Sequence, residues 1–92
     1  QVNGFRVELG EVEHHLRTII GSEAAVVLAH EKEGVIELVG FIQGDWNQED
    51  ILSQMREKVP GYMVPRQLFI IEALPINTSG KIDKKLLREK YL

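Results

Sequence analysis

Gly80 and Lys81 are the residues whose types and order best suit a chemical role in this chain of 92 residues. They end a stretch rich in turn-forming residues, 74–81, that lies between an apolar run and a charged, helix-forming run. A lysine ammonium is a compact charge on a flexible stem, so on a projecting loop it would suit a reaction that brings anions together. The spacing of a phosphate-binding P-loop is absent. The alternative is that Gly80 shapes a turn and Lys81 is an ordinary solvated lysine.

A second segment, residues 3–13, contains a glycine before a run of charged residues. Arg6 and Glu8 stand two residues apart, so on a strand they would share a face and could form an ion pair. The alternative is an edge strand followed by an acidic first turn of helix, which the helix dipole favours.

A third segment, residues 59–65, places Gly61, Tyr62 and Met63 between two prolines. Pro60 and Pro65 fix their backbone φ angles, and a thioether fills irregular gaps well. We interpret this segment as a rigid connector whose Tyr62 and Met63 side chains complete the core.

No metal site is expected from the histidines. His14 and His15 are adjacent, so on a helix they point about 100° apart and do not chelate one ion. Glu11 and His15 are neighbours four residues apart, but they are more often a surface pair than two metal ligands. The chain has no cysteine, which leaves no thiolate zinc site and fits a reducing compartment.

Charge and hydropathy restrict the classes of partner. The net charge is −3 and the only basic cluster is short, so we expect no nucleic-acid partner. No apolar run approaches the ~18 residues of a membrane-spanning helix, so we expect no membrane partner. The chain opens at Gln1 without a methionine, and we interpret it as a piece of a longer protein.

Hydrophobic periodicity predicts the elements that must position these residues. Residues 8–20 are predicted to form an amphipathic helix that Gly21 ends. Its core-facing residues are Leu9, Val12, Leu16, Ile19 and Ile20, and its polar face carries Glu11, Glu13, His14 and Arg17. Runs at 24–29 and 35–42, joined by a turn at 31–34, predict an antiparallel hairpin buried on much of both faces.

The second half of the chain is predicted to add two helices and one strand. Asn47 caps a helix that Pro60 stops, and residues 67–71 form a strand. Asp83 caps a last helix, in which Leu86, Leu87 and Tyr91 are expected to face the core. The predicted fold is α+β, a small sheet of about three main strands packed with helices.

Taken together and in this order, the three segments resemble the last three core motifs of nonribosomal peptide synthetase adenylation domains. The matching residues are Gly4, Arg6, Val7, Glu8, Leu9, Glu11, Val12 and Glu13; then Pro60, Tyr62, Met63, Val64 and Pro65; then Gly80, Lys81, Ile82, Asp83 and Lys84. The resemblance runs from Gln1 to about Arg88. Two features depart from it: Gln1 stands where the family often has lysine, and the hinge aspartate expected upstream of Gln1 is not in the chain.

The resemblance implies that residues 1–92 are a single C-terminal subdomain of an adenylation domain whose large N-terminal subdomain is absent. In such a ligase, Lys81 would be the catalytic residue and Gly80 would be one of the cofactor-binding residues. Gly4, Phe5 and Arg6 would form the loop that faces the pantetheine arm. The implied cofactors are ATP and Mg²⁺, bound mainly by the large subdomain, and phosphopantetheine. The implied partners are that subdomain, a peptidyl carrier protein and an amino acid, in the cytoplasm, and the isolated fragment is expected to be inactive.

Two other functions fit the sequence. The nearest is the equivalent subdomain of an acyl-CoA synthetase or another carboxylate ligase, which would use free coenzyme A as acceptor. The more distant is a small α+β interaction module without a catalytic role, in which Lys81 would be ordinary.

Overall fold

The computed structural model describes residues 4 and 6–92, and it confirms the predicted α+β class. The elements are α1 (Leu9–Ile20), β1 (Ala25–Lys32), β2 (Val35–Gln43), α2 (Gln48–Lys58), the short 3₁₀ helix η1 (Gly61–Met63), β3 (Gln67–Ile71) and α3 (Lys84–Tyr91). All but η1 were expected from the sequence.

The three strands form one mixed sheet in the order β1-β2-β3. β1 and β2 are antiparallel and are joined by Glu33 and Gly34, both with positive φ, as a two-residue hairpin turn requires. β2 and β3 are parallel, which needs a crossover connection, and α2 lies within it. β2 is therefore the central strand, and β1 and β3 are edges.

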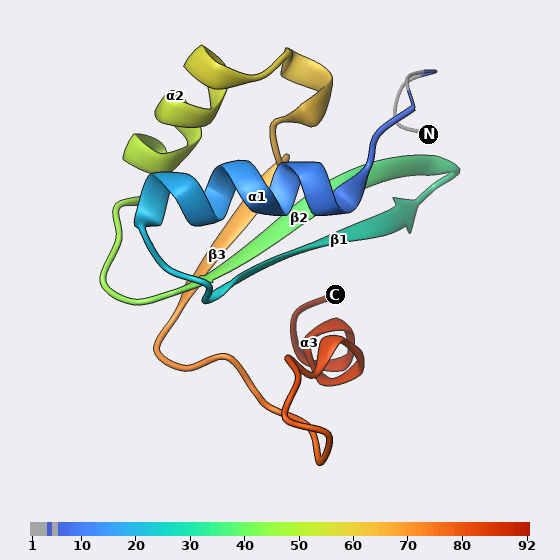
Figure 1. Cartoon of the computed structure of the whole chain (residues 1–92). Coiled ribbons are helices and arrows are strands. Elements are labelled where there is room, and N and C mark those ends of the chain that lie inside the picture. Colours follow the sequence, from blue (N-terminus) through green and yellow to red (C-terminus); the bar gives the residue numbers. More distant parts are fainter. Residues whose placement is uncertain (1–3, 5) are drawn as a thin grey trace.

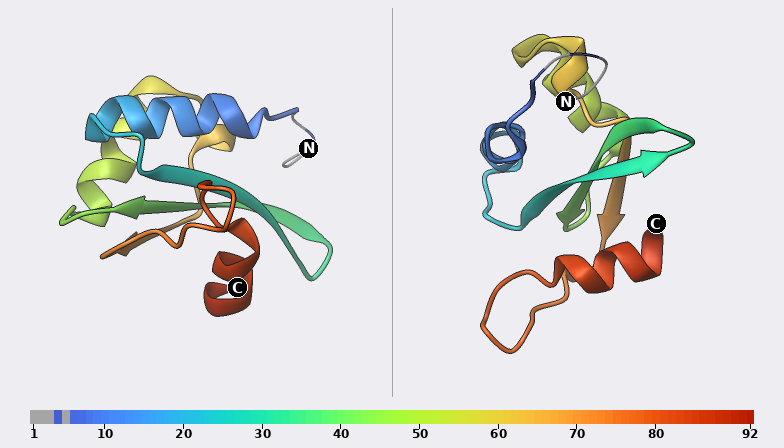
Figure 2. Two further views of the ribbon diagram at one scale, coloured as in Figure 1. Left: turned by 60° about the horizontal axis from the view of Figure 1, so that its bottom comes forward. Right: turned by 90° about the vertical axis from the view of Figure 1, so that its right-hand side faces the viewer.

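Helices cover both faces of this sheet. α1 and α2 lie on one face and α3 lies alone on the other, as Figures 1 and 2 show. Successive strand residues point to opposite faces, so neighbours in β1 and β2 enter different core clusters. The cluster under α1 and α2 includes Val12, Leu16, Val27, Leu38, Ile42 and Met55. The cluster under α3 includes Val26, Leu28, Val39, Phe41 and Leu87, with Phe69 and Tyr91 packed against it.

The predicted helix ends are confirmed. Gly21 adopts the left-handed conformation at the C-terminus of α1. The side chain of Asn47 accepts a hydrogen bond from the Asp50 N–H at the start of α2, and Asp83 accepts one from the Leu86 N–H at the start of α3. These caps satisfy N–H groups that have no partner inside the helix.

Three expectations need correction. Leu86 is 44% exposed whereas Leu87 is 1% exposed, because adjacent helical residues point about 100° apart and only one can meet the sheet. Glu13, expected on the polar face of α1, is buried at 8% exposure. The β1–β2 turn is shorter than predicted, since β1 continues to Lys32.

Candidate functional site

Lys81 lies in a small hairpin that connects β3 to α3. An isolated antiparallel bridge joins Ile76 to Ile82, and the Asp83 N–H donates to the carbonyl oxygen of Pro75 at 2.8 Å. The Asn77 N–H donates to the carbonyl oxygen of Lys81 at 2.8 Å. These bonds hold the two ends of the connection together, so the residues between them form a closed turn.

The tip of this hairpin is also held internally. The Gly80 N–H donates to the carbonyl oxygen of Asn77 at 3.0 Å, and Gly80 has a φ of 80°, a conformation that residues with a Cβ rarely adopt. The Asn77 side-chain oxygen accepts from the N–H groups of Ser79 and Lys81. The sequence predicted a projecting loop rich in turn-forming residues here, and the structure shows that its tip is a hydrogen-bonded turn.

The Lys81 side chain is exposed and available. Within the described part of the chain, no carboxylate forms an ion pair with it. It borders a shallow open depression that is also lined by Glu13, Arg17, Asp83, Lys84 and Lys85, among others. Two of these are acids, but Glu13 is already bonded to Arg17 and Asp83 already caps α3, so the depression presents mainly cationic groups.

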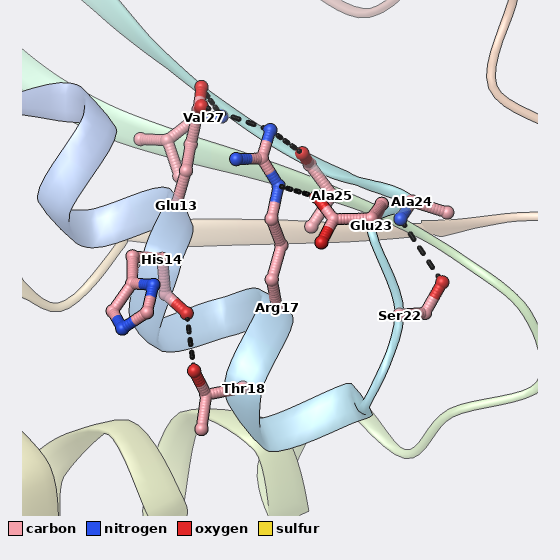
Figure 3. A network of polar contacts seen from close by, with 9 residues as sticks. All are labelled: Glu13, His14, Arg17, Thr18, Ser22, Glu23, Ala24, Ala25 and Val27. Carbon is pink, nitrogen blue, oxygen red and sulfur yellow. Dashed lines mark hydrogen bonds and ion pairs between the residues drawn. The ribbon is translucent and has the colours of Figure 1, made fainter.

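Glu13 and Arg17 form a polar network that sequence reasoning missed (Figure 3). One Glu13 oxygen accepts from the Val27 N–H at 3.0 Å, and the other accepts from an Arg17 nitrogen at 3.3 Å. The same Arg17 nitrogen donates to the carbonyl oxygen of Ala25 at 3.2 Å. Because β1 is an edge strand, these side chains bind backbone groups that no neighbouring strand pairs.

One signal in the sequence could have revealed this network. Val12 belongs to the apolar stripe of α1, and Glu13 directly follows it. Arg17 stands four residues after Glu13, at the spacing of a helical ion pair. A carboxylate beside an apolar stripe, with an arginine within reach, fits a buried pair as well as a solvated face.

The segment before α1 lies far from Lys81. In Figures 1 and 2 the chain that leads into α1 and the β3–α3 connection lie at opposite ends of the molecule, on either side of the sheet. Gly4 is exposed with a φ of 81°. The predicted ion pair of Arg6 and Glu8 is present at 3.2 Å, but it precedes α1 in irregular chain, where both side chains are exposed. Phe5 lies outside the described residues.

The connector at 59–65 has the structural role predicted for it. Met63 is buried, and Tyr62 packs against the core cluster under α1 and α2. The described residues contain no group of three or more acidic, histidine or cysteine side chains that could hold a metal ion. Nor does any helix among them have the length and apolar character needed to cross a bilayer.

Known proteins match this chain across the same three segments. Residues 11–81 match the model of the AMP-binding enzyme C-terminal domain. A plipastatin synthase polypeptide of Bacillus subtilis (strain 168) is 40% identical in an alignment 92 residues long. This alignment covers 97% of this chain and 4% of that protein. A mycosubtilin synthase polypeptide of Bacillus subtilis is 38% identical over 89 residues, covering 95% of this chain and 3% of that protein. The chain thus spans only a few per cent of the length of these relatives.

Solved structures share the whole fold. A four-domain nonribosomal peptide synthetase bound to AMP and glycine superposes with a TM-score of 0.81 at 29% identity, covering 100% of this chain and 7% of that one. A fatty acyl CoA synthetase of Mycobacterium tuberculosis superposes with a TM-score of 0.84 at 24% identity, covering 98% of this chain and 19% of that one. At that lower identity the likeness concerns the fold.

Proposed function

Because the chain belongs to the family of AMP-binding enzyme C-terminal domains, we propose that it is the mobile C-terminal subdomain of an amino-acid-activating adenylation domain. Residues 1–92 would form this subdomain, and a large N-terminal subdomain would precede it. The four-domain nonribosomal peptide synthetase that shares the whole fold at 29% identity supports this choice of enzyme class.

The observation that carries the proposal is Lys81 itself, exposed on a hydrogen-bonded turn and in no ion pair with the other residues that the structure describes. In adenylate formation, a carboxylate must approach the α-phosphate of ATP, and the two anions repel each other. An ammonium placed between them offsets this repulsion, and it is worth more in a cleft from which water is excluded. An ammonium already held by a carboxylate of its own subdomain could not do this, and no carboxylate in residues 6–92 holds Lys81.

The second half-reaction would use the other end of the domain. We assign Gly4, Phe5 and Arg6 to the loop that faces the phosphopantetheine arm during thioester transfer. Since the segment before α1 lies opposite the Lys81 hairpin, one orientation of the domain would not present both ends to the same active site. This supports a rotation of the subdomain between adenylation and transfer.

Most binding of small molecules would take place outside this chain. We expect ATP and Mg²⁺ to bind mainly to the large subdomain, together with the amino acid, and phosphopantetheine to arrive on a peptidyl carrier protein. Lys81 would meet the phosphate and carboxylate oxygens only when the two subdomains close. We therefore expect no activity from the isolated domain, and we assign the complete enzyme to the cytoplasm, where ATP is available.

An acyl-CoA synthetase is the second candidate, because such an enzyme shares the entire fold. The acceptor of the acyl group separates the two. We would measure amino-acid-dependent exchange of pyrophosphate into ATP by the intact enzyme, and then transfer of the activated acid to its carrier protein and to free coenzyme A. Exchange with an amino acid followed by carrier loading supports the proposal. Exclusive transfer to coenzyme A, or no exchange with any carboxylic acid, would contradict it.

A further inference from the structure

Asn77 bonds to the Lys81 segment through both its backbone and its side chain. Its side-chain oxygen accepts from the Ser79 N–H at 2.9 Å and from the Lys81 N–H at 3.1 Å. Its backbone N–H donates to the carbonyl oxygen of Lys81 at 2.8 Å, and its carbonyl oxygen accepts from the Gly80 N–H at 3.0 Å. Asn77 is therefore bonded to both the N–H and the carbonyl oxygen of Lys81.

Core packing contributes little to the tip of this turn. Residues 76–81 are all exposed, and the nearest residue packed on the core cluster under α3 is Ile82, at the end of the hairpin. Fixing the backbone of an exposed segment is entropically unfavourable, most of all at a glycine such as Gly80. The local hydrogen bonds must therefore define the conformation, and among the described residues Asn77 supplies every side-chain bond in the turn.

We infer that Asn77 is a positioning residue for Lys81: its side-chain oxygen holds the Lys81 N–H, and so fixes the direction in which the ammonium leaves the hairpin. The inference rests on the proposed catalytic function of Lys81. Asn77 would act through the backbone of Lys81 and not on a reacting group. Its neutral amide supplies a hydrogen-bond acceptor without placing a carboxylate close to the ammonium, where an ion pair would compete with the anionic substrates.

The effect should fall on one half-reaction. Asn77→Ala removes two side-chain hydrogen bonds of ordinary strength, so the turn samples conformations in which Lys81 points elsewhere. We expect adenylation to slow by about tenfold, far less than for loss of the ammonium itself. Thioester transfer uses the opposite end of the domain and should remain within about twofold of the parent rate.

The test uses the intact enzyme with four variants: Asn77→Ala, Lys81→Ala, the double variant and Thr78→Ala. Thr78 is the matched control, because it is exposed in the same turn and, in the described structure, its side chain makes no hydrogen bond. Single-turnover rates are measured for adenylation and for transfer from supplied aminoacyl-adenylate. If Asn77 acts only through Lys81, Asn77→Ala should cause no further loss once Lys81 is alanine.

A second readout follows the backbone directly. Amide hydrogen exchange of the peptide that spans residues 77–82 should speed up in Asn77→Ala and stay unchanged in Thr78→Ala. Asn77→Asp keeps the acceptor oxygen, so it should keep the slow exchange.

The outcomes separate this inference from the proposed function. If Lys81→Ala abolishes adenylation but Asn77→Ala does not slow it, or slows both half-reactions equally, Asn77 has no positioning role. An additive loss in the double variant, or fast exchange in Asn77→Asp, would also overturn the inference. If Lys81→Ala leaves adenylation intact, the proposed function itself fails.

Discussion

At the scale of single residues, Lys81 differs from the other lysines in how its backbone is held. All six lysines fall within the described structure, and Lys81 is the only one outside a regular helix or strand. A lysine in a helix or strand has its backbone fixed by that element. Lys81 instead extends from a turn whose direction is set by local hydrogen bonds, which would suit the proposed entry of its charge into a neighbouring active site.

Gly4 supplies a prediction at the same scale. A Cβ at this position would have no atom of residues 6–92 within 4 Å, so these residues leave room for a larger side chain. We expect Gly4→Leu in the intact enzyme to slow carrier loading by about tenfold or more while adenylation changes little, because the side chain would obstruct the pantetheine arm. Loading is measured with radiolabelled amino acid.

Gly4→Ala is the matched control for this variant. Both substitutions place a Cβ on a backbone with a φ of 81°, so both carry the same backbone strain, and only leucine adds bulk. Normal loading by Gly4→Leu, or an equal loss in Gly4→Ala, would show that bulk at this position does not reach the pantetheine path.

At the scale of elements, the edge strand β1 depends on two side chains of α1. Glu13→Ala would leave the buried Val27 N–H without its side-chain acceptor and would take from the Arg17 guanidinium its bond to Glu13, leaving its bonds to Ala25 and Glu23. We expect a loss of about 2–3 kcal/mol in the free energy of unfolding. Urea unfolding of the 92-residue chain, followed by circular dichroism, measures it.

Glu11→Ala is the control on the same helix, since Glu11 is exposed in the first turn. Its loss should stay below about 1 kcal/mol, the usual size of a helix-dipole effect. If Glu13→Ala and Glu11→Ala lower the free energy of unfolding equally, the bonds of Glu13 do not stabilise the edge strand β1.

Helix α3 gives a second matched pair. Leu87 packs in the cluster under α3, whereas its neighbour Leu86 is exposed. Leu87→Ala should destabilise the chain by about 2–5 kcal/mol, and Leu86→Ala by less than about 0.5 kcal/mol, in the same unfolding measurement. Similar values for both would mean that α3 does not dock on the sheet through Leu87.

Local signals in the sequence predicted most elements and their ends. Gly21, Asn47 and Asp83 act within a few residues of their own positions, so their roles could be recognised from spacing alone. The parallel pairing of β2 with β3 and the burial of Glu13 depend on contacts between distant segments, and neither was predicted. The position of Lys81 in a stretch of turn-forming residues was predicted. The hydrogen bonds by which Asn77 holds that turn were not, because an asparagine side chain in a loop can bond to many different groups.

At the scale of the whole molecule, the domain presents two separate ends on either side of one sheet. The Lys81 hairpin and the segment before α1 are joined through a core with two packed faces, so we expect the domain to move as one body. A rotation of that body would exchange one end for the other in the active site of the large subdomain. The account therefore predicts that damage to one end affects one half-reaction.

The most direct test of this account is the rate of each half-reaction in the Lys81→Ala variant of the intact enzyme. Lys84→Ala, which removes a lysine bordering the same depression, is the control. Adenylation should fall by ~10²–10³ in Lys81→Ala, with thioester transfer from supplied adenylate unchanged, and Lys84→Ala should retain both rates. Equal losses in both half-reactions of Lys81→Ala, or normal adenylation, would contradict the catalytic role of Lys81.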